Sequence, residues 1–211
     1  MSGVYKTITY PQKMKNIDCA ALFFNTVKFD ERTMTEELLD IISDEDIITG
    51  QELRSTVHAL GLQHRGVHVF LFRRDGKMLV QKRSADRAAS PSMLDCSISE
   101  HVKAGESYFD AALRGMKEEM GVTGIEINPL VTFRMNYGIN DNEISRLFEG
   151  IVDPEKVKFD PVEIEEIGYF SVDEIREMMK EGKVKFCGWF IEILNWHLGE
   201  PSKLLILDTN D

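Results

Sequence analysis

The segment from Glu100 to Val122 constrains the fold more than any other part of the chain, because acids, glycines and an arginine recur in it at definite spacing. Residues 108–120 carry apolar side chains at helical spacing, and Gly121 is suited to end a helix because glycine adopts a positive φ without strain. The segment therefore predicts a loop that leads into one amphipathic helix. Its sequence is Glu100-His-Val-Lys-Ala-Gly105-Glu106, seven residues, then Arg114-Gly-Met-Lys-Glu-Glu-Met-Gly121-Val122.

The predicted helix has an apolar face and an acidic face. Carboxylate oxygens suit Mg²⁺ or Mn²⁺, so Glu118 and Glu119 are predicted metal ligands. Lys-Glu-Glu is also common on solvated helix faces, which is the simpler interpretation of the pair alone. Gly115 lies one turn before both glutamates, and an acid there would complete a three-carboxylate cluster. At about 100° per residue, the face expected to be buried consists of Phe109, Ala112, Leu113, Met116 and Met120.

The spacing resembles the Nudix signature, which reads Gly, five residues, Glu, seven residues, then Arg-Glu-U-x-Glu-Glu-x-Gly-U, where U is aliphatic. Glu100 stands where the signature has its first Gly, and Gly115 where it has the Glu after Arg. The resemblance implies an α/β (α+β) Nudix fold, with a mixed β-sheet between helices. It implies an N-terminal extension, residues 1–36, before a Nudix domain, residues 37–211. It also implies structural roles for four signature residues, Gly105, Glu106, Arg114 and Gly121, with the arginine bracing the loop through Glu106.

The flanking sequence predicts the strands and helices that complete such a fold. Alternating apolar residues and turn residues predict hairpins over 38–51 and 67–83, the second around Asp75-Gly76. A polar loop, 136–143, is expected between strands 125–135 and 144–152. Elsewhere the patterns predict a short helix over 53–60, an extended segment over 94–102, a strand over 165–170, a helix capped by Ser171 and Glu174, and a last helix over 190–197.

Beyond the signature, residues 37–199 are similar to the isopentenyl diphosphate isomerase-like branch of the Nudix superfamily. The similarity lies in Gly61-Leu-Gln-His64-Arg65, in Asp95-Cys-Ser before His101-Val102, and in Lys185-Phe-Cys-Gly-Trp189-Phe. In that isomerase, three histidines and a Glu-x-Glu motif hold a metal. The resemblance thus implies a second metal site, for which imidazole and carboxylate favour Mn²⁺ or Zn²⁺. A capping or solvated role for His58 stays open. The matching positions are His58, His64, His101, Asp141 and Glu143.

The position of the isomerase's catalytic Cys is occupied by Ser99. An unactivated hydroxyl is a poor group for moving protons at carbon, and Cys96 would point to the opposite face of an extended strand. We therefore expect a hydrolase that cleaves a diphosphate linkage with Mg²⁺ or Mn²⁺, with Glu119 or Glu143 as the catalytic group and Trp189 in the substrate pocket. A glutamate introduced at Gly115 is expected to raise activity. A catalytically weak diphosphate-binding or regulatory module is the alternative, and an isomerase lacking its Cys a weaker one.

The charge balance limits the partners. Asp and Glu number 36 against 25 Lys and Arg, for a net charge of −11, which argues against binding of a nucleic-acid duplex. A bound divalent cation would neutralise acids where a small-molecule diphosphate sits. Cys19, Cys96 and Cys187 form no pairing motif, and no apolar run is long enough to cross a bilayer, so we expect a cytoplasmic protein without membrane association. A homodimer and the organic part of the substrate stay open.

Overall fold

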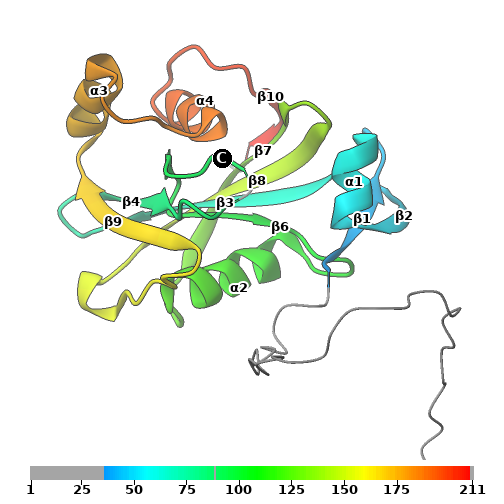
Figure 1. Cartoon of the computed structure of the whole chain (residues 1–211), viewed down its shortest axis with the longest axis horizontal. Helices are drawn as coiled ribbons and strands as arrows, with labels where there is room; N and C mark the ends of the chain where they lie inside the picture. Colours follow the sequence, from blue (N-terminus) through cyan, green and yellow to red (C-terminus); the bar gives the residue numbers. More distant parts are fainter. Residues whose placement is uncertain (1–35, 88, 210–211) are drawn as a thin grey trace, which may run out of the picture. The chain divides into compact units, whose positions relative to one another are not determined.

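A mixed β-sheet with helices on both faces organises the part of the chain that the computed structural model describes, residues 36–87 and 89–209 (Figure 1). The strand order is β10-β7-β8-β3-β4-β5, with β6 beside β3 and β9 beside β4. The β3–β8 pair is parallel and the other pairs are antiparallel. The strands are β3 (His64–Phe72), β4 (Met78–Arg83), β5 (Leu94–Asp95), β6 (Ile98–His101), β7 (Ile127–Gly138), β8 (Asp141–Ile151), β9 (Ile164–Phe170) and β10 (Leu205–Thr209).

The helices divide between the two faces of this sheet. Helix α2 (Tyr108–Met120) covers one face, and α3 (Val172–Glu181) and α4 (Gly188–His197) lie on the other (Figure 1). A separate hairpin of β1 (Leu38–Ile42) and β2 (Ile48–Leu53) leads into α1 (Arg54–Leu60), and a 3₁₀ turn spans Pro154–Lys156. The expected N-terminal extension lies outside the described residues apart from Glu36.

Strand β3 shows why the sheet is buried on both sides. Val67 and Val69 belong to the core that contains Met116 and Met120 of α2. Phe70, the residue directly after Val69, belongs to the other core, which lies on the face covered by α3 and α4. Successive side chains of a strand point to opposite faces, so a continuous apolar run satisfies both cores. The expected Nudix-type arrangement, a mixed sheet between helices, is confirmed.

Helix α2 begins and ends where the sequence predicts, but its buried face is rotated. The Ser107 side chain accepts a hydrogen bond from the Asp110 backbone, and Gly121 ends the helix at φ 63°. Phe109, expected in the core, is 46% exposed. The prediction was wrong for Phe109, because the helix also buries small and polar residues on the side that faces the sheet. It is confirmed for Ala112, Met116 and Met120. That face consists of Tyr108, Ala111, Ala112, Gly115, Met116, Glu119 and Met120.

The polar stretch 136–143 is not the loop that was expected. Strand β7 continues to Gly138 and β8 starts at Asp141, so the connection is a tight turn in which Asn140 has a φ of 61°. The Asn136 amide donates to the Asn142 side chain at 2.6 Å across the ribbon. Polarity was a poor guide here because these strand ends are half exposed. As a result, Asp141 and Glu143 lie on a strand rather than on a flexible loop.

The segment 94–102 is broken in the middle instead of running as one strand. Ser97 lies between β5 and β6, and its hydroxyl accepts from the Leu71 amide at 2.8 Å and donates to the Leu79 carbonyl at 2.6 Å. It thereby bridges β3 and β4 where these strands diverge. Because of the break, strict strand alternation does not extend from Cys96, which is fully buried, to Ser99.

Strand β10 forms one edge of the sheet and pairs with β7, and it was not among the expected strands. All its residues are exposed, so its apolar side chains lack the alternation that signals a half-buried strand. Among the described residues, no helix has both the length and the apolar character needed to cross a membrane.

Candidate functional site

A cavity of about 560 Å³ lies where α1, the end of β6, the start of β8 and the first turn of α4 come together. His58 and Asp141 line one side of it, and Arg83 and Trp189 line another. Ser99, Glu100 and Glu143 also face it. Residues separated by more than a hundred positions in the sequence therefore share one cavity.

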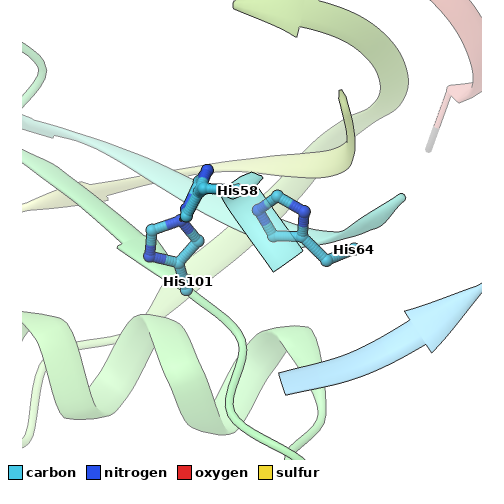
Figure 2. A group of neighbouring side chains, drawn as sticks. All are labelled: His58, His64 and His101. Atoms are coloured by element: carbon cyan, nitrogen blue, oxygen red, sulfur yellow. The ribbon is translucent and has the colours of Figure 1, made fainter. Parts of the chain in front are cut away.

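Three histidines from three different elements converge beside this cavity (Figure 2). His58 comes from α1, His64 starts β3 and His101 ends β6. Their ring centroids are 5.0–5.2 Å apart, and the Nε2 atoms of His58 and His101 are separated by 3.2 Å. Gly61 makes the approach possible, because its φ of 65° ends α1 and returns the chain directly into β3.

Two carboxylates of β8 complete the cluster. Asp141 Oδ1 lies 3.4 Å from His58 Nδ1, and Glu143 Oε1 lies 3.5 Å from His64 Nε2 and 3.8 Å from His101 Nε2. The parallel pairing of β3 with β8 sets His64 opposite Glu143. A Cβ at Gly66 would overlap the Glu143 carboxylate, so the glycine makes room for it. The structure thus brings together the five residues that the resemblance implied as a second metal site.

The hydrogen bonds of His64 leave one ring nitrogen available. Its Nδ1 lies 3.0 Å from the Leu62 carbonyl, to which it donates, and its Nε2 is buried without a hydrogen-bond partner. Asp141 Oδ1 is also buried and without a hydrogen bond. A buried nitrogen lone pair that faces two carboxylates is unfavourable unless a proton or a cation lies between them. The donor set therefore fits a divalent cation held by imidazole and carboxylate, as Mn²⁺ or Zn²⁺ is.

Burial and the Glu143 carboxylate shift the pKa values within the histidine cluster in opposite directions. Burial lowers the pKa of His58, and it lowers the pKa of His101 to about 3. Burial opposes the charged form of His64 too, but the adjacent Glu143 carboxylate outweighs it and raises the pKa of His64. Burial and the charge of Glu143 raise the pKa of Asp141 to about 6. The lowered pKa values keep His58 and His101 neutral, and a neutral imidazole is the form that binds a metal.

The loop before α2 is held by Arg114. Its guanidinium donates to both carboxylate oxygens of Glu106, at 2.9 and 3.1 Å, and to the His101 carbonyl at 2.8 Å. Gly105, at φ 80°, donates its amide to Asp40 at 2.9 Å. Arg114 thus braces the loop through Glu106, as the resemblance implied, and ties the loop to the histidine cluster.

The two adjacent glutamates of α2 have different surroundings. Glu118 is 55% exposed in its side chain and pairs with Arg114 at 3.2 Å. Glu119 is 4% exposed, and its Oε2 accepts from Gln81 at 2.9 Å. The ligand atom of Glu119 groups with those of Glu100 and Glu163, all within 4.8 Å of one another. The structure therefore does not bring Glu118 into a cluster with Glu119.

Gly115 packs directly beneath β6. An ideal Cβ there would lie 2.7 Å from Ile98 Cγ2 and 2.9 Å from Glu100 Cγ. Distances below about 3.0 Å require neighbouring atoms to move. A glutamate at position 115 would therefore have to displace Ile98 and Glu100 from their present positions, and its effect on activity stays a prediction.

A chain of hydrogen bonds forms the wall between the histidine cluster and Trp189. Three of its members, His68, Tyr137 and Ser145, were not singled out by motif, because the signal is spatial and not sequential. From the cluster outward the contacts are Ser145 Oγ to Glu143 at 2.8 Å, Tyr137 to Ser145 at 2.9 Å, His68 Nε2 to Tyr137 at 3.0 Å, His68 Nδ1 to Ser99 at 3.1 Å, Ser99 to Asp95 at 3.2 Å, and Trp189 Nε1 to Asp95 at 2.6 Å.

Trp189 and Arg83 form the far side of the cavity. The Arg83 guanidinium lies 5.6 Å from the centre of the Trp189 ring and donates to Asp95 at 2.9 Å. Because Asp95 also accepts from Trp189, all three side chains are held in place. Trp189 therefore presents a fixed aromatic surface to the cavity, and its role in binding a substrate stays a prediction.

The profile of the NUDIX domain matches residues 62–190. The Nudix hydrolase SCO1686 of Streptomyces coelicolor is 38% identical over 102 residues, and the match spans 48% of this chain and only 56% of that protein. An isopentenyl-diphosphate Delta-isomerase of Streptomyces griseus is 29% identical over 164 residues, 75% of this chain and 82% of that protein. The crystal structure of DR0079 from Deinococcus radiodurans has a TM-score of 0.66 at 25% identity and covers 76% of this chain and 98% of that one.

Proposed function

The chain belongs to the NUDIX domain family, and we propose that it is a divalent-metal-dependent hydrolase that cleaves a diphosphate linkage in a small organic substrate, such as a nucleoside diphosphate conjugate. One observation carries the proposal. The five side chains of the histidine cluster lie beside the same cavity that Arg54, Arg83 and Trp189 line. A cation-binding side and an aromatic side in one cavity match the two halves of such a substrate.

Charge explains why a cation is needed. The cavity is lined by the carboxylates of Glu100, Asp141 and Glu143, which would repel a diphosphate. Arg83 is paired with Asp95 at 2.9 Å, whereas Arg54 is paired with Glu37 at the longer distance of 3.6 Å, so Arg54 is the lining cation better placed to bind phosphate oxygens. When bound, Mg²⁺ or Mn²⁺ supplies positive charge that offsets the negative charge of the phosphate oxygens and makes phosphorus more susceptible to attack.

The residues of the chain have separable roles in this proposal. Glu143 is oriented by Ser145 and kept ionised, because burial, which would raise its pKa, is outweighed by His64, which lowers the pKa to about 2. We assign it to orient the attacking water, and we assign Glu119 to cation binding. Trp189 offers a ring against which the organic part of the substrate can stack.

The test incubates the protein with a panel of nucleoside diphosphate conjugates and prenyl diphosphates in the presence of Mg²⁺ or Mn²⁺. Release of phosphate is monitored by ³¹P NMR. Turnover should occur with at least one member, and Glu119→Gln should lower it by about a hundredfold or more. Glu166→Gln, which removes an exposed acid of β9, is the matched control. Unchanged turnover in Glu119→Gln would contradict the role given to Glu119.

The alternative is a diphosphate-binding or regulatory module with little catalysis. Gly115 favours it, because the helix lacks an acid that the Nudix signature has. This alternative predicts no turnover of any compound in the panel, together with Mg²⁺-dependent thermal stabilisation of the protein by one of the compounds. That result would replace the hydrolase proposal.

A further inference from the structure

We propose that Glu100, Glu119 and Glu163 form a divalent-cation site separate from the histidine cluster, in which Glu100 of β6 supplies the carboxylate that α2 lacks at Gly115. The use of this site in catalysis rests on the hydrolase proposal, but cation binding does not. Both departures from the signature, an acid in place of Gly and a Gly in place of an acid, are explained by this one exchange of position.

Sterics connect the two departures. The space next to Gly115 is occupied by the Glu100 side chain, whose Cγ would lie 2.9 Å from a Cβ at position 115. A side chain at 115 and the present Glu100 therefore exclude each other. Because a glycine at 115 leaves room, a carboxylate carried by the neighbouring strand lies directly above the face of the helix that holds Glu119.

The geometry of the carboxylates points to a ligand. One oxygen from each of Glu100, Glu119 and Glu163 lies within 4.8 Å of the others. Glu119 is 4% exposed, and its Oε1 is buried with no hydrogen-bond partner, while its Oε2 accepts from Gln81. A buried carboxylate oxygen that accepts no hydrogen bond is costly unless a cation or proton occupies the space in front of it.

The charge balance around the cluster leaves one carboxylate uncompensated. Glu100 pairs with Arg114 at 3.2 Å, and Glu163 pairs with Arg87 at 2.9 Å. Glu119 has no ion pair with a described Lys or Arg, and the neutral Gln81 is its hydrogen-bond donor. Three hard oxygen ligands without nitrogen suit Mg²⁺ or Mn²⁺, in contrast to the imidazole-rich cluster around His64. Glu100 also lines the cavity, so a cation here would face the same space.

The test is titration of the full chain with Mn²⁺ alone, with free Mn²⁺ measured by electron paramagnetic resonance. To remove the other site, the titration is done in a background that carries His58→Ala and Asp141→Asn. Glu100→Gln and Glu163→Gln should each weaken the remaining site by about tenfold or more. Glu166→Gln removes an exposed acid from the strand that Glu163 precedes and should leave Mn²⁺ affinity unchanged.

Glu118→Gln separates this arrangement from a Glu118–Glu119 pair. Our proposal expects a smaller loss of Mn²⁺ affinity from Glu118→Gln than from Glu100→Gln, and the reverse order would overturn it. Unchanged Mn²⁺ affinity in Glu100→Gln would also overturn it. If Glu100→Gln does not fold, as judged by circular dichroism, Glu163→Gln takes its place in the test, and unchanged Mn²⁺ affinity in Glu163→Gln would overturn the proposal.

The outcome is independent of the hydrolase proposal. Mn²⁺ binding that depends on Glu100, without turnover of any substrate, would support the site and reject the hydrolase. Turnover together with Mn²⁺ binding that is indifferent to Glu100 would reject the site alone. A Mn²⁺ anomalous difference peak among the three carboxylates would locate the ion directly, and crystals grown in Mn²⁺ with a peak at the histidines only would contradict the proposal.

Discussion

The Nε2 atom of His64 lies 3.5 Å from Oε1 of Glu143, too far for a good hydrogen bond and close enough for both atoms to bind one ion. The His64 ring is fully buried and oriented by the Leu62 carbonyl. The pair is therefore prearranged before any cation enters.

A cation at this cluster should stabilise the fold. Mn²⁺ or Zn²⁺ at a hundred times its dissociation constant should raise the free energy of unfolding by about 2.7 kcal/mol, because it binds the folded state alone. His58→Ala should remove most of this gain, as measured by thermal unfolding with and without metal. His197→Gln is the control, since His197 packs against Phe70 and Phe72. Equal metal-induced shifts in both variants would contradict a histidine site.

Gly115→Ala should destabilise the chain by about 1–3 kcal/mol, the usual cost of forcing extra atoms into a packed core. The added methyl would lie 2.7 Å from Ile98 Cγ2 and would displace Glu100. Urea unfolding measures the difference. Gly188→Ala is the matched helical control, because a Cβ there meets nothing within 4 Å. An unchanged free energy of unfolding in Gly115→Ala would show that β6 moves aside at little cost. It would then remove the steric argument that links Gly115 to Glu100.

We expect no incorporation of deuterium into isopentenyl diphosphate in D₂O with Mg²⁺ or Mn²⁺. The Ser99 hydroxyl is engaged by His68 and Asp95, and Cys96 is 0% exposed. Burial raises the pKa of the Cys96 thiol, which makes it a poorer acid–base group. ¹H NMR against a protein-free blank, with an active isomerase run in parallel, provides the measurement. Exchange above the blank would show that the chain has isomerase chemistry without a cavity thiol.

The histidine cluster could be anticipated from the sequence, because the resemblance identified His58, His64 and His101 by short local motifs. Strand pairing then brings these motifs together in space. The capping roles of Gly121 and Ser171 could also be anticipated from the sequence, because they depend on a few adjacent residues. Local patterns are informative where the physical cause is local.

The carboxylate cluster could not be anticipated in this way. Glu163 follows no motif, and Glu100 was interpreted only as a missing glycine. Its relation to Gly115 arises from the packing of β6 on α2, which a helical wheel does not contain. The wheel placed Phe109 inside for the same reason, since it weighs hydrophobicity and not the small residues that let a helix approach a sheet.

Glu106 provides a prediction of pH dependence that involves no metal. Burial would raise its pKa, but the hydrogen bonds from Arg114 outweigh this and lower it below the ordinary value of 4.5. A carboxyl whose folded-state pKa is lowered adds stability above its unfolded pKa, and this stability is lost as pH falls through the folded value. Glu106→Gln should therefore lower the free energy of unfolding by about 1 kcal/mol at pH 7, discounted for partial exposure. Urea unfolding should show the difference from wild type shrinking below pH 4.5, and a constant difference down to acid pH would contradict the charge-based role of the Arg114–Glu106 pair.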